Sequence, residues 1–214
     1  MIKGVIFDMD GVLVDNRDVH VAAFQKWCEK HNIVLPSSFL INFFGMGNED
    51  IFRQVLADPD LELSAIKRYS AEKEAIYRDM FAQTIAPVAG LVALLDELKK
   101  RGIKIAVGSS GMRPNVEFVL RACHIEQYFD AIADGDMIHR AKPDPEVFLL
   151  GAELMGLRAH ECFVFEDSFA GIAAARAAGM GVGALATTFA RPLHTDYDFL
   201  IDDFTQITAD EFIK

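Results

Sequence analysis

The chain has 214 residues, of which 51% are hydrophobic, and this is enough for one large domain or for a core with an insert. The formal net charge of -11 disfavours nucleic acid and anionic membrane surfaces as partners, although local cations or a metal ion still permit an anionic substrate. The scattered cysteines Cys28, Cys123 and Cys162 are expected to be free thiols in a reducing compartment.

The chain enters its first apolar segment almost at once, so we expect no signal peptide. No apolar run approaches the roughly 18 residues that a membrane-spanning helix needs. These observations predict a cytoplasmic protein.

The first predicted element is a short strand, GVIF, at residues 4–7. The segment behind it has apolar residues at helical spacing and no clear strand before Pro87. Helices are expected at 18–31, 38–44, 49–57 and 64–84, with breaks at PSS, GMGN and DPDLELS. We therefore expect a helical cap domain of residues 16–86, inserted into a core domain of residues 1–15 and 87–214.

From Pro87 onward, predicted strands and helices alternate. Strands are expected at 103–108, 130–133, 162–166, 181–186 and 199–201, and helices at 89–101, 113–123, 145–155, 169–178 and from about 208. This alternation is typical of an α/β fold with a doubly wound, Rossmann-like parallel sheet that helices cover on both faces. Ligands of such sheets bind at the carboxyl ends of the strands.

Two carboxylates, Asp8 and Asp10, follow the first strand in the run FDMDGVLVD. Residues two apart in an extended segment point to the same side, and Gly11 lets the chain turn sharply afterwards. We expect Asp8 to attack phosphorus and form an aspartyl phosphate, while Asp10 protonates the leaving oxygen and then activates water. The alternative is an ordinary pair of surface aspartates at a strand end.

Ser109 and Ser110 follow the strand IKIAVG and lie between two glycines, which permit close approach of the backbone to a phosphate. A helix N-cap is the alternative role for Ser109, and both roles can hold together. Lys142 lies in AKPDPEVF, where Pro143 and Pro145 stiffen the chain and fix one cation at the phosphate. A solvated surface lysine is the alternative there.

Glu166 and Asp167 stand at the end of the strand CFVFE. Two carboxylates at such a position are costly unless they meet a cation, and ligands that are all oxygens favour Mg2+. Mg2+ is therefore the expected cofactor. Capping of the next helix by Asp167 or Ser168 is the alternative.

These four segments, in this order, resemble the motifs of the haloacid dehalogenase superfamily of phosphatases and phosphomutases. FDMDGVLVD is similar to the first motif, VGSS to the second, AKPDPEVF to the third and FEDSFAGIAAARAAGM to the fourth. The resemblance covers essentially the whole chain. It implies that Mg2+ is held by the Asp8 carboxylate, the Asp10 backbone carbonyl and Asp167, with Glu166 as a ligand or an adjacent group. Dehalogenases of the family lack a counterpart of Asp10, so the resemblance favours phosphoryl transfer.

The pattern resembles the branch that contains beta-phosphoglucomutase and related sugar-phosphate phosphatases. His20 and Lys73 match cap residues of the mutase, and the resemblance implies that His20 helps to couple cap closure to Asp10. An ordinary polar residue on the first cap helix is the alternative for His20. The mutase holds a second phosphate with basic residues, whereas this chain has Phe44 and Asn48 at the matching stretch.

Loss of a desolvated cation from the site that holds the second phosphate weakens phosphate binding by about 2 kcal/mol. We therefore expect hydrolysis of a small phosphorylated metabolite, a sugar or polyol phosphate. A sugar phosphomutase is the alternative because Arg17, Lys73 and Arg113 can partly replace the missing cations, and pyrophosphate hydrolysis also stays open. Residues 44–53 contain no lysine, which disfavours the Schiff-base chemistry of the family's phosphonate-cleaving members.

A phosphorylated switch of the receiver type uses similar residue types, but its phosphorylated aspartate lies on a later strand and it has no helical insert. We expect instead a cap that opens and closes through short linkers near 14–17 and 84–89. The expected specificity residues on the cap are Arg17, His20, the stretch 45–48 and Lys73. A monomer is the simplest expectation.

Overall fold

The computed structural model describes residues 1–35, 48–188 and 196–213. The chain divides into two compact units, one of Met1–Asp15 with Ile85–Lys214 and one of Asn16–Thr84. The sequence pattern predicts that the chain returns from the helical cap to the core domain at residue 87, whereas the larger unit resumes at Ile85. Within the described ranges, no helix has the length and the apolar character that crossing a bilayer requires.

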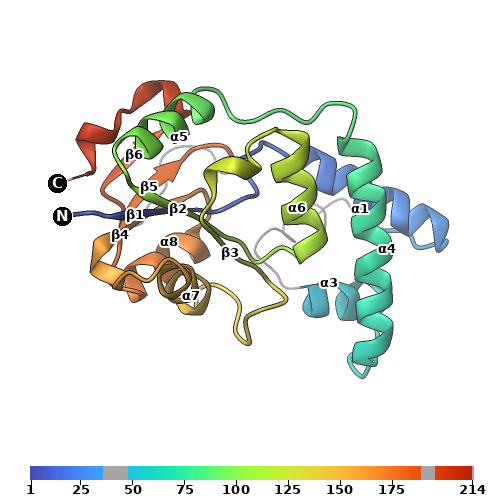
Figure 1. Cartoon of the computed structure of the whole chain (residues 1–214). Coiled ribbons are helices and arrows are strands. Elements are labelled where there is room, and N and C mark those ends of the chain that lie inside the picture. Colours follow the sequence, from blue (N-terminus) through green and yellow to red (C-terminus); the bar gives the residue numbers. More distant parts are fainter. Residues whose placement is uncertain (36–47, 189–195, 214) are drawn as a thin grey trace. The chain divides into compact units, whose positions relative to one another are not determined.

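The larger unit is built on a six-stranded sheet in the order β3-β2-β1-β4-β5-β6, in which each pair of neighbouring strands runs parallel (Figure 1). The strands are β1 (Gly4–Phe7), β2 (Lys104–Gly108), β3 (Ala131–Ala133), β4 (Cys162–Glu166), β5 (Gly181–Leu185) and β6 (Phe199–Ile201). Because β1 pairs with both β2 and β4, its carboxyl end lies between theirs. The predicted α/β fold class is confirmed.

Helices follow most of these strands: α5 (Leu91–Lys100), α6 (Arg113–Ala122), α7 (Glu146–Leu154) and α8 (Phe169–Ala177). Figure 1 shows α7 and α8 on one face of the sheet and α5 on the other. Successive side chains of β1 point to opposite faces of the sheet, as they do in any strand. Ile6 packs into a buried cluster with Phe148 and Ile172, whereas Phe7 stacks on Phe165 with ring centroids 5.2 Å apart.

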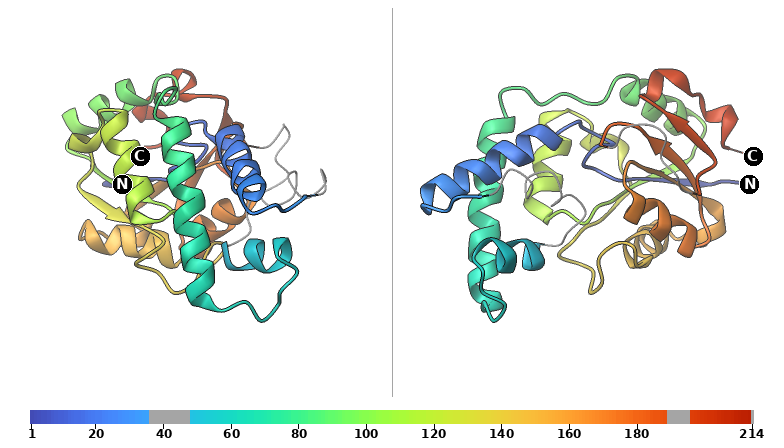
Figure 2. Two further views of the ribbon diagram at one scale, coloured as in Figure 1. Left: turned by 90° about the vertical axis from the view of Figure 1, so that its right-hand side faces the viewer. Right: turned by 180° about the vertical axis from the view of Figure 1, so that it is seen from behind.

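The helical unit contains α1 (Arg17–Lys30), α3 (Asn48–Val55) and α4 (Leu63–Phe81), and α1 packs against α4, which it crosses in the right-hand view of Figure 2. Its core is largely aromatic and includes Phe24, Trp27 and Phe52, which are all buried. The helix that the sequence predicts at 38–44 lies outside the described residues.

The predicted helix from about residue 208 is wrong. The described C-terminal residues form two short 3-10 turns, η3 (Phe204–Gln206) and η4 (Ala209–Glu211). Thr208 and Glu211 cap η4 reciprocally, and the buried ring of Phe212 then packs against Phe163 at 4.9 Å between centroids. The reciprocal cap and the burial of Phe212 therefore favour one closed turn over a continuing helix.

Candidate active site

The centre of the site is Asp8, the first residue after β1, which is only 6% exposed. Its backbone N–H donates to the Phe165 carbonyl at 3.0 Å, so the pairing of β1 with β4 continues one residue past the strand. This backbone bond fixes the place of the carboxylate at the carboxyl edge of the sheet.

A buried lysine, Lys142, neutralises this carboxylate. Its Nζ lies 2.6 Å from Asp8 Oδ1, 2.7 Å from Glu166 Oε1 and 4.6 Å from the ring centroid of Phe148. Burial opposes the charged ammonium, but the charges of Asp8 and Glu166 outweigh it and raise the pKa of Lys142. Lys142 is therefore a fixed cation of the site, and its side chain is only 8% exposed.

Both oxygens of Glu166, the last residue of β4, already have partners. Oε1 accepts from Lys142, while Oε2 accepts from the backbone N–H of Asp167 at 2.7 Å and from that of Ser168 at 2.6 Å. Gly171 leaves room for this arrangement, because a Cβ there would lie 1.7 Å from Glu166 Oε1. Ser168 is also the N-cap of α8, which confirms one of the two capping residues considered.

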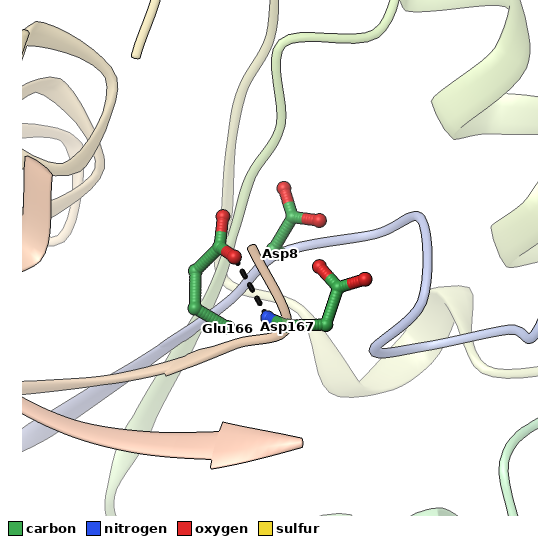
Figure 3. Close-up of side chains that lie close together, drawn as sticks. All are labelled: Asp8, Glu166 and Asp167. Atoms are coloured by element: carbon green, nitrogen blue, oxygen red, sulfur yellow. Dashed lines mark hydrogen bonds between the residues drawn. The ribbon is translucent and has the colours of Figure 1, made fainter. Parts of the chain in front are cut away.

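Three carboxylates converge at this edge. Asp8, Glu166 and Asp167 each offer one oxygen, and these oxygens lie within 4.8 Å of one another (Figure 3). Burial, with Glu166 and Asp10 nearby, raises the pKa of Asp8 to about 7, and burial with Glu166 and Asp8 raises the pKa of Asp167 well above its usual value.

This donor set fits Mg2+. It consists of oxygens alone, and its buried negative charges are those that a bound cation would stabilise. Since both Glu166 oxygens are occupied, Asp8 and Asp167 are better placed to supply ligand atoms, with Glu166 beside them.

The loop after β2 lies next to the carboxylates. Ser109 is 1% exposed, its N–H donates to the Ala133 carbonyl at 3.0 Å, and its Oγ accepts from the Gly111 N–H at 2.9 Å. A Cβ on Gly111 would lie 3.1 Å from Ser109 Oγ and 3.9 Å from Asp10 Oδ2, so both side chains border the same space. Ser110 is exposed.

The alternative role of Ser109 as a helix N-cap is wrong. Helix α6 begins at Arg113, and Met112 is its N-cap residue. The Ser109 hydroxyl instead closes the turn of its own loop, which leaves that loop to shape a binding surface.

Arg113 pairs with a buried carboxylate that the sequence analysis missed. Its Nε lies 2.6 Å from Asp134 Oδ2, and Asp134 is completely buried. The Gly135 N–H also donates to the Gly111 carbonyl at 2.8 Å, so the segment after β3 holds the loop after β2. Asp134 follows a predicted strand as Asp8 does, and that position was the available signal.

The predicted cap residues lie in the helical unit. Lys73 Nζ is 2.8 Å from His20 Nδ1 and 2.9 Å from Glu74 Oε1, and the His20 ring stacks on Tyr77 with centroids 3.9 Å apart. Because an ammonium can only donate, His20 Nδ1 is the acceptor, and a neutral ring carries its proton on Nε2. The Lys73 charge is thus already paired within this unit.

The other cap predictions divide as follows. Arg17 is the first residue of α1 and Asn48 is the first of α3, where only its backbone is described. Phe44 and residues 45–47 lie outside the described residues. The roles of Arg17, His20, Asn48, Lys73 and Arg113 toward a substrate stay predictions.

Known proteins are similar to this chain in sequence and in fold. The sequence profile of the family described as haloacid dehalogenase-like hydrolase matches residues 5–185. Hexitol phosphatase A from Escherichia coli (strain K12) is 31% identical over 97% of this chain and 94% of that protein. The crystal structure of beta-phosphoglucomutase from Clostridium difficile is 26% identical, with a TM-score of 0.85 over 99% of this chain and 95% of that one. The match to Protein SUPPRESSOR OF QUENCHING 1, chloroplastic, from Arabidopsis thaliana is 30% identical, but this chain spans 21% of that protein.

Proposed function

Because the chain belongs to the haloacid dehalogenase-like hydrolases, we propose that it is a Mg2+-dependent phosphatase of a small phosphorylated metabolite, a sugar or polyol phosphate. The observation that carries this proposal is the buried contact of Lys142 with Asp8 and Glu166 beside Asp167. A carboxylate, a fixed cation and a set of oxygen ligands are the groups that phosphoryl transfer to an aspartate requires.

The proposed reaction has two steps. An oxygen of the Asp8 carboxylate forms a bond to phosphorus while the ester P–O bond breaks, and Asp10 gives its proton to the leaving oxygen. Water then attacks phosphorus and passes a proton to Asp10, and the bond between phosphorus and Asp8 breaks. The products are the free alcohol and inorganic phosphate, and both carboxyl groups return to their starting states.

Other groups position the phosphate. Lys142 supplies positive charge beside Asp8, and the loop of Ser109 and Ser110 offers two hydroxyl groups at the neighbouring strand end. Mg2+, held by Asp8, Asp167 and the Asp10 carbonyl, would add charge that stabilises the transferring phosphoryl group.

A sugar phosphomutase is the second candidate, which the likeness to beta-phosphoglucomutase keeps open. The ion pairs favour hydrolysis instead. Arg113 forms an ion pair with Asp134, and Lys73 forms one with Glu74. Two of the cations that could bind a second phosphate in place of the missing basic residues are therefore already paired with carboxylates. Pyrophosphate is a third possible substrate class.

The test is a substrate panel. The purified full chain is incubated with Mg2+ and sugar phosphates, polyol phosphates, other phosphomonoesters and pyrophosphate, and 31P NMR follows the products. We expect inorganic phosphate from a sugar or polyol phosphate, and none after Mg2+ is removed with EDTA. Isomerised sugar phosphate as the main product from beta-glucose 1-phosphate with a bisphosphate primer would establish the mutase. Release from pyrophosphate alone would establish the third candidate.

A further inference from the structure

We propose that two adjacent threonines after β5, Thr187 and Thr188, are positioning residues of the metal site. This inference rests on the proposed Mg2+-dependent function. Their hydroxyl groups connect the loop after β1 with the loop after β4. None of the four motif segments includes β5 or the residues that follow it.

Thr187 fixes the loop that carries Asp10. Its Oγ1 donates to the Gly11 carbonyl at 2.5 Å, across 176 positions of sequence. The same loop is closed by the Gly11 N–H, which donates to the Val14 carbonyl at 2.8 Å. Gly11 is thus held through both its donor and its acceptor, and the adjoining Asp10 carbonyl, a proposed ligand, is held with it.

Thr188 contacts the carboxylate of Asp167. It is 9% exposed and its hydroxyl donates a hydrogen bond to the Asp167 side chain. A Cβ on Gly11 would lie 2.0 Å from Asp167 Oδ2 and 2.8 Å from Thr188 Oγ1, so the two oxygens share the space that this glycine leaves open. The φ of +79° at Gly11 also disfavours any side chain there.

These two hydroxyl contacts hold the proposed metal ligands in place from outside the carboxylate cluster. Asp167 has no lysine contact like that of Asp8 or Glu166 among the ion pairs of the described residues. A hydroxyl that orients its carboxylate therefore sets which oxygen faces a cation. Groups that orient ligands in this way change metal affinity by about 10- to 100-fold when they are removed.

The experiment measures Mg2+ binding without substrate. Isothermal titration calorimetry with MgCl2 compares the wild-type chain with Thr187→Val and Thr188→Val. Each variant replaces the hydroxyl by a methyl group and keeps the shape of the side chain. Thr187→Ser and Thr188→Ser restore the hydroxyl. Thr205→Val is the matched control, because Thr205 is exposed and its hydroxyl donates to Asp203, the N-cap residue of η3. Thermal melting in EDTA shows whether each variant folds. If Thr188→Val does not fold, Thr188→Ala takes its place.

We expect each valine variant to bind Mg2+ about 10-fold more weakly than wild type, while the serine variants and Thr205→Val bind like wild type. Wild-type affinity in both valine variants would overturn the positioning role and leave the proposed function standing. Serine variants as weak as the valine variants would overturn the hydroxyl as the cause. A wild-type chain that binds no Mg2+ would overturn the proposed metal dependence, and the positioning role with it.

Discussion

Lys142 Nζ donates to Asp8 Oδ1 at 2.6 Å, and the two side chains are only 8% and 9% exposed although 134 positions separate them in sequence. A buried ion pair of this kind stabilises little when complete, but loss of one partner leaves the other charge uncompensated. The pair therefore ties the chemistry of the site to its stability.

Replacement of Lys142 by methionine keeps the length of the side chain and removes its charge. We expect phosphate release to fall about 100-fold or more, because a fixed positive charge in a buried site is lost. We also expect a lower melting temperature, since Asp8 and Glu166 lose their shared cation. Lys99→Met is the control, because Lys99 contacts Asp130 at the surface. Wild-type kinetics in Lys142→Met would contradict the role of this lysine.

Replacement of Gly171 by alanine tests whether Glu166 must keep its place. The added Cβ would lie 1.7 Å from Glu166 Oε1, so the carboxylate has to leave its bond to Lys142. We expect at least a 10-fold loss of kcat/KM in a phosphate-release assay. Gly151→Ala, on α7, is the control: its added Cβ would lie nearest the side chain of Ile6, at 3.2 Å, and should change activity little. Equal activities in the two variants would show that the position of Glu166 is not critical.

The helical unit has a pH response of its own. Hydrogen bonds from Lys30, His31 and Trp27 lower the pKa of Glu72 from 4.5 to about 2. Its stabilising contribution is thus complete above about pH 4.5, where the unfolded carboxyl is also ionised, and is lost as the pH falls toward about 2. Between these values we expect the free energy of unfolding to fall by about 1 kcal/mol more in wild type than in Glu72→Gln.

Trp27 makes this measurable, because it is the only tryptophan of the chain and its Nε1 donates to Glu72 at 3.0 Å. Urea unfolding followed by its fluorescence across this pH range gives the free energy for the helical unit. Glu49→Gln, which removes an exposed partner of Arg53 on α3, should keep the wild-type pH dependence. The same pH dependence in Glu72→Gln and wild type would refute the assignment.

The strand ends were predictable because each is a short apolar run followed by a polar residue, as at Asp8 and Glu166. The C-terminal turn was not, since the residues after Thr208 suit a helix as well as one capped turn, and the burial of Phe212 decides between them. The Thr187 contact with Gly11 was equally hidden, because a threonine after a strand has no distinctive spacing.

The partners of Arg113 and Lys73 illustrate a further limit. Each residue was recognisable as a cation near the expected site, but Asp134 and Glu74, which engage them, carry no motif. Sequence patterns identify charged residues more readily than the pairing that decides whether a charge can serve a substrate.

Replacement of Asp8 by asparagine tests the nucleophile. The amide has nearly the same shape as the buried carboxylate, so we expect a folded chain with the wild-type circular dichroism spectrum and without measurable phosphate release. Asp18→Asn, on α1 in the helical unit, is the matched control and should retain turnover. A folded Asp8→Asn variant with a rate near wild type would exclude Asp8 as the nucleophile.

The most direct measurement is to stop a turnover with acid and examine the peptide that contains Asp8 by mass spectrometry. A phosphatase that works through an aspartyl phosphate should carry a phosphoryl group on Asp8 while substrate and Mg2+ are present, and should lose it when the substrate is consumed. Substrate turnover with Asp8 unmodified, or with the phosphoryl group on another residue, would contradict the account.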